Sequence, residues 1–346
     1  MPSFEEAAVA EVLSERPGIT RVRLETGERA YALTEVTGPV GLGDRVVVNT
    51  TAVRLGLGTG GWHVVHWNLT RGPWTKEGPG HLMKARYTSI QTDVGAAEED
   101  EPDMATSLAS MPVVVCGLHS QLPVVAAAVI EAEPNARVAY VMTDGGALPL
   151  ALSDMVERLR QRDLLVGTVT TGHAFGGDLE SLNVPSGLAA ARHLLGADIA
   201  VVAMGPGVAG TGTRLGFTAL EVAPALDAAA WLGGQPVACV RASSGDGRGR
   251  HQGISHHTRT ALDATRSEVD VAVPPDLEVS SQMRARHRWE VVDPGPVGEM
   301  LTRFDLRVTT MGRGPDEDPL FFDAAASAGR RAASLLGSFR RPGTHP

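Results

Sequence analysis

Histidines and an aspartate recur just after short apolar runs in the second half of the chain. The residues concerned are His119, Asp144, His173 and His256. A neutral imidazole transfers protons or ligates a divalent metal, and a carboxylate orients the imidazole or joins the metal. These four residues are therefore catalytic candidates, and the alternative for each is an ordinary hydrogen-bonded loop residue. The residue types do not decide whether a metal is bound.

A glycine-rich segment follows a further apolar run, Ile199–Met204, and we expect a helix over Thr213–Trp231 behind it. Backbone amides at a helix N-terminus, with glycines that permit close approach, suit a phosphate or a carboxylate. The predicted anion-binding residues are Gly205, Gly207, Gly210, Thr211, Gly212, Thr213 and Ser243. The alternative is a glycine-rich packing turn.

Gly205–Gly210 also fits the pattern G-x-G-x-x-G of dinucleotide-binding folds. The fit is incomplete, because the segment follows the fourth apolar run instead of the first. In addition, Arg241 and Ser243 stand after the next run, where an acidic residue would bind the ribose. A nicotinamide cofactor is therefore a minor alternative, and no Walker motif is present.

A basic stretch, Arg241–Arg250, leads to the pair His256 and His257. Its arginines suit bidentate contacts to an anion, and its glycines suit a mobile flap, while a solvated loop is the plain alternative. Ser255 is expected to cap the helix that starts at the histidines. Adjacent residues point about 100° apart on a helix, so we expect only one histidine to face a site.

These residues must be positioned by a repeated strand and helix pattern. Apolar runs expected as strands are Val113–Gly117, Val138–Met142, Val166–Thr170, Ile199–Met204, Val237–Val240, Val269–Val273, Trp289–Val292 and Leu306–Thr310. Helices are expected over Val124–Glu133, Leu148–Gln161, Pro185–Leu195, Thr213–Trp231, Thr258–Arg266, Val297–Phe304 and Leu320–Leu336. Continuous apolar strands between helices indicate a doubly wound, mainly parallel α/β sheet. Ligands bind at the carboxyl ends of such strands, where the candidate residues lie.

The first part of the chain differs, because short runs alternate apolar and polar residues between glycine-containing turns. This pattern predicts a small N-terminal β-barrel or β-sandwich over residues 1–75. Residues 76–110 are expected to be a connector, and residues 111–340 a Rossmann-like α/β domain.

Composition and charge limit the classes of partner that we expect for this chain. The formal net charge of −9 lacks the basic footprint of nucleic-acid binding, so we expect no nucleic-acid partner. Two cysteines, Cys116 and Cys239, lie in apolar runs and are read as buried free thiols. No run reaches the roughly 18 apolar residues that span a membrane, and no signal peptide is evident. We therefore expect a cytoplasmic protein without a membrane partner, and leave a homo-oligomer open.

Several stretches resemble a bacterial family of unknown function that is common in high-GC Gram-positive bacteria. They include the motifs LHSQ at 118–121, MTDG at 142–145, GPGVAGTGT at 205–213 and SHHT at 255–258, besides residues 42–68, 172–177 and 307–312. The resemblance spans nearly the whole chain and implies that the loops and the N-terminal β domain form one unit. It brings no activity or cofactor with it.

Our first hypothesis is an enzyme that acts on a small anionic or phosphorylated metabolite at the carboxyl edge of the sheet. A second is a non-catalytic sensor or adaptor for a small ligand, and a third is an NADP-linked reductase. Whether the chain is an enzyme stays open at this point. Histidine nitrogens that converge on one another or on Asp144 would favour catalysis or metal binding, and dispersed histidines a sensor.

Overall fold

The computed structural model describes residues 1–57, 60–80 and 82–339, with side chains up to residue 336. The chain divides into two compact units, Met1–Gly95 and a second unit that begins at Ala96. The boundary falls inside the predicted connector, so residues 76–95 belong with the barrel. Residues 96–110 belong with the α/β unit.

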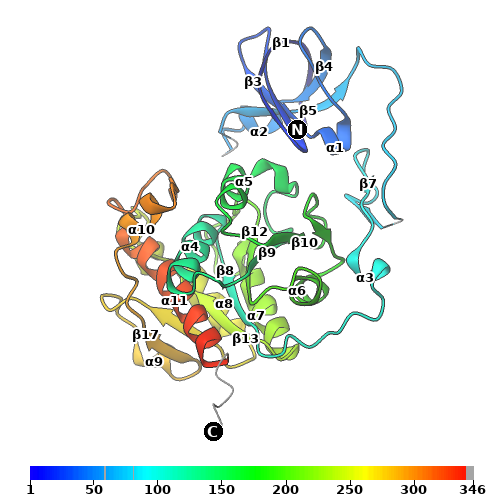
Figure 1. The fold of residues 1–346 in the computed structure, drawn as a ribbon. Coiled ribbons are helices and arrows are strands. Elements are labelled where there is room, and N and C mark those ends of the chain that lie inside the picture. Colours follow the sequence, from blue (N-terminus) through cyan, green and yellow to red (C-terminus); the bar gives the residue numbers. More distant parts are fainter. Residues whose placement is uncertain (58–59, 81, 340–346) are drawn as a thin grey trace. The chain divides into compact units, whose positions relative to one another are not determined.

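Five strands close the first unit into a barrel (Figure 1). They are β1 (Phe4–Arg16), β2 (Ile19–Leu24), β3 (Arg29–Ala32), β4 (Arg45–Asn49) and β5 (Trp62–Asn68), in the order β1-β2-β3-β5-β4. Only β3 and β5 pair in parallel. Alternate residues such as Val22, Ala30 and Val65 fill the interior. Of the two predicted architectures, the barrel is correct.

Strand β1 has no counterpart in the predicted runs. Its sequence FEEAAVAEVLSER carries four glutamates and has no clean alternation of apolar and polar residues. Pairing with both β2 and β4 closes the barrel and satisfies its backbone, so tertiary pairing overrides the local pattern. Short helices α1 (Thr34–Thr37) and α2 (Thr51–Arg54) and the hairpin of β6 (Met83–Lys84) and β7 (Thr92–Asp93) complete this unit.

The second unit, which opens with α3 (Ala97–Asp100), is built on an eight-stranded sheet in the order β11-β10-β9-β12-β8-β13-β16-β17. All its pairings are parallel. The strands are β8 (Pro112–Cys116), β9 (Val138–Thr143), β10 (Gly167–Thr170), β11 (Leu179–Glu180), β12 (Ile199–Met204), β13 (Gln235–Cys239), β16 (Asp270–Val273) and β17 (Arg288–Val291). This confirms the predicted α/β class. Cys116 and Cys239 are free, buried and direct register partners.

Helices cover both faces of this sheet (Figure 1). One apolar core holds α4 (Leu122–Ala132), α5 (Asp154–Gln161), α10 (Val297–Arg303) and α11 (Pro319–Phe339). The other holds α6 (Val184–His193), α7 (Val222–Trp231), α8 (His256–Ala264) and α9 (Ser281–Arg284). Gly329 lets α11 approach α4 closely, because a Cβ there would lie 2.6 Å from the Val125 carbonyl oxygen.

Strand order determines where a ligand fits. In chain order the main strands lie as 3-2-4-1-5-6-7, which differs from the 3-2-1-4-5-6 order of dinucleotide-binding folds. The connections from β8 and β9 run to one side of the sheet, and those from β12 and β13 to the other. Crevices are therefore expected between the ends of β9 and β12 and between those of β8 and β13.

Two predicted elements are wrong. The helix expected over Thr213–Trp231 begins only at Val222, after the short 3₁₀ helix η3 (Thr218–Glu221). The strand expected over Leu306–Thr310 does not form, and only an isolated bridge joins Thr310 to Arg313. Leu306 and Val308 pack into the core beside α10 and α11, so the helices bury the apolar side chains that suggested a strand. None of the helices in the described ranges could cross a membrane.

Candidate functional site

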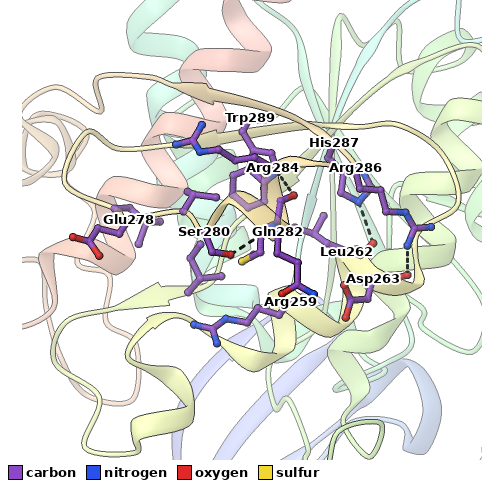
Figure 2. Close-up of a pocket in the computed structure, with 14 residues that line it drawn as sticks. Arg259, Leu262, Asp263, Glu278, Ser280, Gln282, Arg284, Arg286, His287 and Trp289 are labelled. Carbon is purple, nitrogen blue, oxygen red and sulfur yellow. Dashed lines mark hydrogen bonds between the residues drawn. The ribbon is translucent and has the colours of Figure 1, made fainter.

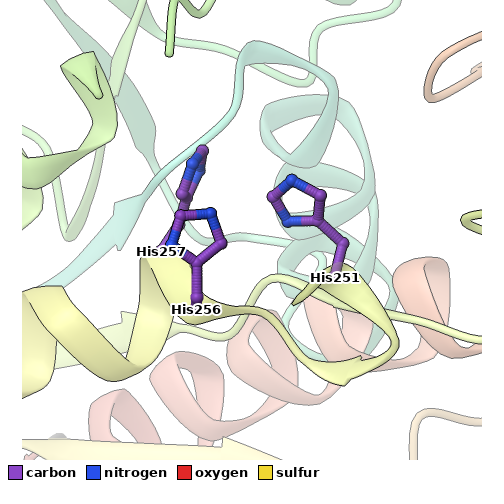
Figure 3. Close-up of side chains that lie close together, drawn as sticks. All are labelled: His251, His256 and His257. Atoms are coloured by element: carbon purple, nitrogen blue, oxygen red, sulfur yellow. The ribbon is translucent and has the colours of Figure 1, made fainter. Parts of the chain in front are cut away.

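Three histidines meet at the carboxyl edge of the sheet. The ring nitrogens of His251, His256 and His257 include one atom from each residue that all lie within 4.8 Å of one another. Figure 3 shows the His256 and His257 rings at the start of α8 and the His251 ring facing them from the preceding segment. Ring centroids are 4.4 Å apart for His256 and His257, and 5.0 Å from His251 to either. We call these three residues the histidine cluster.

Local hydrogen bonds build the cluster. Ser255 caps α8 as predicted, since its hydroxyl accepts from the His257 backbone N–H at 3.2 Å. The same hydroxyl lies 2.7 Å from Nδ1 of His251, which ends the short 3₁₀ helix η4 (Gly249–His251). A two-stranded hairpin of β14 (Ala242–Ser243) and β15 (Gly253–Ile254) closes the loop between them. Both adjacent histidines join this cluster, whereas we expected only one of them to face a site.

Arginines surround the cluster. Arg241 donates from a guanidinium nitrogen to Nδ1 of His257 at 2.9 Å. Arg248 makes a two-pronged contact with the buried carboxylate of Asp246, at 2.9 and 2.7 Å, and Arg313 lies 3.6 Å from the same carboxylate. Arg250 is exposed and has no hydrogen bond or ion pair among the described residues. The basic stretch is thus anchored at Asp246 and leaves Arg250 available to solvent.

Burial and positive charge hold the histidines neutral. Burial, reinforced by Arg241, lowers the pKa of His251 to about 4 and that of His257 to about 3. The pKa of His256 is also lowered, by burial and then by Arg250 and Arg241. Hydrogen bonds from Arg248 hold the pKa of Asp246 far below its usual range. The site therefore presents neutral imidazoles in a positive field.

The glycine-rich loop folds over this site as a hairpin. Thr211 N–H donates to the Gly216 carbonyl at 2.7 Å, and Thr218 N–H donates to the Ala209 carbonyl at 2.9 Å. Phe217 stacks on the His257 ring with centroids 4.0 Å apart. A Cβ on Gly210 would lie 3.9 Å from Nε2 of His257, and one on Gly212 would lie 4.0 Å from the Arg250 guanidinium carbon.

This hairpin differs from the predicted helix N-terminus. Gly207 and Gly212 have φ values of 99° and 79°, which favour glycine, and they turn the chain before α7 begins. The N–H groups of Gly207, Val208, Gly210 and Gly212 find no acceptor within the part of the chain that the structure describes. The amides are thus available to an anion, but without a helix dipole behind them.

The remaining predicted anion-binding residues have structural partners. The Thr211 hydroxyl contacts that of Thr213 at 2.9 Å, and both bond to Gly216. The buried Ser243 hydroxyl donates to Asp318 at 2.6 Å. Gly205 is needed for close approach, since a Cβ would lie 2.3 Å from the Ala147 carbonyl oxygen.

The histidine cluster also meets the first requirement of a metal site, which is convergent nitrogens. Nε2 of His256 is buried without a hydrogen-bond partner among the described residues, and His251 has one nitrogen oriented by Ser255. His257 fits poorly, because a ligating histidine normally donates its second N–H, whereas here Nδ1 faces a guanidinium that only donates. The nearby guanidinium groups further oppose a dication.

His119, a predicted catalytic residue, lies apart from the cluster. Its Nδ1 lies 3.2 Å from the Met204 carbonyl oxygen, and its Nε2 lies 2.7 Å from the Ser153 hydroxyl that caps α5. Burial lowers its pKa to about 4. Both nitrogens are therefore occupied, as the alternative of a hydrogen-bonded loop residue requires.

We expect His119→Ala to lower the free energy of unfolding by about 2 kcal/mol, because it removes two hydrogen bonds and leaves a cavity. Urea denaturation measures this loss. The exposed His193 serves as control, and its replacement by Ala should change stability by less than about 0.5 kcal/mol. A His119→Ala protein with unchanged stability and lost ligand turnover would instead make His119 catalytic.

Asp144 and His173 meet at a second place on the same edge. Asp144 accepts from the His173 backbone N–H at 2.9 Å, so its carboxylate joins the loops after β9 and β10. Glu221, at the end of η3, accepts a hydrogen bond from the Thr143 hydroxyl. Burial and then the charge of Asp144 raise the pKa of Glu221 to about 7, against a lowering by Thr143. Glu221 was not among the predicted residues.

Another hollow, of about 820 Å³, lies between α8 and the segment that runs into β17 (Figure 2). Part of its polar lining is used internally: Trp289 Nε1 donates to the Met283 carbonyl at 2.9 Å, and His287 Nε2 lies 3.0 Å from the Leu262 carbonyl. None of the predicted site residues lines it. A cavity of only about 20 Å³, large enough for one water, lies beneath His257 in the β8 and β13 crevice.

The structure thus brings His256 together with the glycine-rich loop, and Asp144 together with His173, but it does not unite all four catalytic candidates. Sequence reasoning missed His251 and Glu221, and it chose His256 over His257 because adjacent helical residues point apart. A weak signal existed for the histidines, because three lie within seven residues, 251–257, beside three arginines, 241, 248 and 250. Glu221 had no such signal, since its environment depends on Thr143 and Asp144 from a distant part of the chain.

Comparison with known proteins identifies the family of this chain but no activity. No curated protein matches the chain. The family described as "Protein of unknown function (DUF3866)" matches residues 29–329, which include all eight strands of the parallel sheet and the barrel strands β3, β4 and β5. The predicted resemblance to a family of unknown function is confirmed, and the chain belongs to the DUF3866 family.

Proposed function

We propose that this protein is an enzyme that binds a small phosphate- or carboxylate-bearing metabolite between the histidine cluster and the glycine-rich hairpin. The observation that carries the proposal is the convergence of Gly210 and Gly212 on His257 and Arg250. Two separately predicted loops, one glycine-rich and one basic, thereby meet at a sheet edge where ligands bind.

Charge supports an anion. Arg241, Arg248, Arg250 and Arg313 supply four guanidinium groups near the pocket, against the carboxylates of Asp246 and Asp318. Arg250 is exposed and would contact the anion directly, as a fork of N–H donors. Free backbone amides at Gly210 and Gly212 would add further donors.

His256 is the group proposed to move a proton. Its Nε2 is buried and lacks a partner among the described residues, and its lowered pKa keeps the ring neutral at pH 7. A neutral imidazole accepts a proton, and the nearby bound anion then stabilises the imidazolium. The alternative of a non-catalytic sensor uses the same pocket without this step. The absence of a helix N-terminus behind the glycines weighs against the NADP-linked reductase.

We expect wild-type protein to bind inorganic phosphate or pyrophosphate, measured by isothermal titration calorimetry. Arg250→Ala should weaken binding at least about 10-fold, since charge-assisted hydrogen bonds contribute about 1.5–3 kcal/mol. Arg162→Ala, an exposed arginine paired with Asp305 on the other side of the sheet, should leave affinity unchanged. Equal weakening by both variants, or no binding by the wild type, contradicts the proposal.

Affinity for sulfate, whose charge is constant over this range, should rise as pH falls from about 8 to about 5. The bound anion stabilises the protonated form of the histidines, which are neutral in the free protein. Binding is therefore coupled to proton uptake and becomes tighter as the pH falls. His256→Gln, which removes the proposed proton acceptor, should flatten this profile. If Zn²⁺ stabilised the wild-type protein against unfolding and His256→Ala removed that stabilisation, the cluster would be a metal site instead of an anion site.

The catalytic step is tested by a panel of phosphate esters and activated carboxylates. His256→Gln should lower the turnover rate of any compound that the wild type converts by about 10²-fold or more. Its affinity for phosphate should stay within a few-fold of the wild-type value. Phosphate binding without turnover of any compound on the panel would favour the sensor alternative.

A further inference from the structure

The outer face of the barrel carries a patch that the proposed function does not use. Strand pairing places Arg23 opposite Arg29 and Arg29 opposite Trp62, and a second row runs from Arg21 through Tyr31 to Val64. These six outward positions lie side by side on β2, β3 and β5. We call them the barrel face.

The barrel face alternates with the barrel core. Its residues are exposed or half-buried, whereas Val22, Ala30 and Val65 between them are buried. The segments 19–24, 29–32 and 62–68 hold three arginines and no acidic residue. This local charge is hidden in the net charge of −9, because the acidic residues lie outside these three segments, for example on the neighbouring β1.

Arginine and tryptophan are in direct contact on this face. The guanidinium carbon of Arg29 lies 4.6 Å from the Trp62 ring centroid, and that of Arg21 lies 5.6 Å away. Arg29 is also held by the Gly60 carbonyl oxygen at 2.7 Å, which fixes it at the ring. The face thus offers planar groups and positive charge at one place.

Two glutamates border the barrel face. Glu11 pairs with Arg23 at 3.0 Å, and Glu28 lies 3.3 Å from the buried His63 behind the face. Neither carboxylate is paired with Arg29. Positive charge therefore remains beside Trp62.

We propose that the barrel face binds single-stranded nucleic acid. Bases would stack on Trp62 and Tyr31, and the arginines would contact the phosphates, which is the combination that recognises single strands. An acidic peptide would use the arginines but gain little from the tryptophan ring. This inference reverses the expectation drawn from whole-chain charge, and it is independent of the anion site in the second unit.

The test is fluorescence anisotropy of the full chain with labelled oligo(dT) of about 12 nucleotides at low salt. Trp62→Ala should weaken binding at least about 10-fold, in line with about 1–3 kcal/mol per stacked base. Trp62→Phe should keep most of the affinity. Arg29→Ala should weaken binding and make its salt dependence shallower by about 0.7 for the lost phosphate contact.

Two matched controls lie elsewhere on the barrel. Trp67 on β5 is 39% exposed but belongs to another surface, with Arg71 over its ring, and Arg45 on β4 pairs with Glu6. Trp67→Ala and Arg45→Ala should leave oligo(dT) affinity unchanged. No binding by the wild type, or equal losses in Trp62→Ala and Trp67→Ala, overturns the proposal. Poly-glutamate is the competitor that tests for an acidic peptide. The proposal is also overturned if poly-glutamate displaces oligo(dT) and Trp62→Ala leaves the affinity for poly-glutamate unchanged.

Discussion

An Asp318→Ala variant is expected to unfold with a free energy about 3–5 kcal/mol below that of the wild type. Asp318 is fully buried and accepts hydrogen bonds from the Ser243 hydroxyl at 2.6 Å and from the backbone N–H groups of Ser244 and Gly245 at 2.8 and 3.1 Å. Arg313 donates to it at 3.1 Å. Alanine leaves these donors buried without an acceptor, which costs more than the bonds themselves contribute.

Urea denaturation of Asp318→Ala and of Asp316→Ala separates this effect from the loss of a surface charge. Asp316 is exposed, and its replacement should change the free energy of unfolding by less than about 0.5 kcal/mol. Asp318→Asn, which retains one acceptor oxygen, should show an intermediate loss. If Asp318→Ala lowered the free energy of unfolding by less than about 1 kcal/mol, water would have to reach these donors. Asp318 would then hold the segment Ser243–Gly245 less firmly than we infer.

A Glu221→Gln variant is expected to be more stable than the wild type at alkaline pH, by about 2 kcal/mol near pH 8. The pKa of Glu221 is raised from 4.5 to about 7, first by burial. A raised pKa means that the folded state binds the proton more tightly than the unfolded state. Its contribution to stability is therefore complete below pH 4.5 and is lost as pH rises through about 7.

Glutamine mimics the protonated carboxyl and does not ionise, so the gain should be absent near pH 4.5, grow between about pH 4.5 and about pH 7, and stay constant above that. Equilibrium unfolding in urea at several pH values measures it. Glu299→Gln, an exposed glutamate on α10, is the control and should show no such pH-dependent gain. A gain that is equal at all pH values would show that Glu221 acts through packing and not through its charge.

A group that costs stability at neutral pH is typical of a functional site. Glu221 and Asp144 lie at the crevice between β9 and β12, where the connections diverge. Glu221 is thus a second candidate for proton transfer beside His256, and an activity assay on Glu221→Gln would place it inside or outside the reaction.

Local patterns determined much of the fold. Continuous apolar runs such as Val138–Met142 and Ile199–Met204 predicted buried parallel strands, because only a sheet covered on both faces buries every side chain of a strand. Ser255 predicted the start of α8, because a hydroxyl satisfies free N–H groups at a helix N-terminus. Candidate residues after strand ends were bound to gather at one edge, since parallel strands end there together.

Tertiary structure alone decided which of those residues meet. Strand β8, which leads to His119, borders β13, which leads to the histidine cluster, yet the His119 ring bonds to the Met204 carbonyl and the Ser153 hydroxyl instead, a choice that no local pattern records. Ser255 and Phe217 bring both adjacent histidines into one cluster, although helix geometry alone predicted that they diverge. The barrel face depends on register between β2, β3 and β5, and Glu221 acquires its pKa from Thr143 and Asp144. Each of these features rests on contacts between residues distant in the chain, and composition and periodicity report only on neighbours.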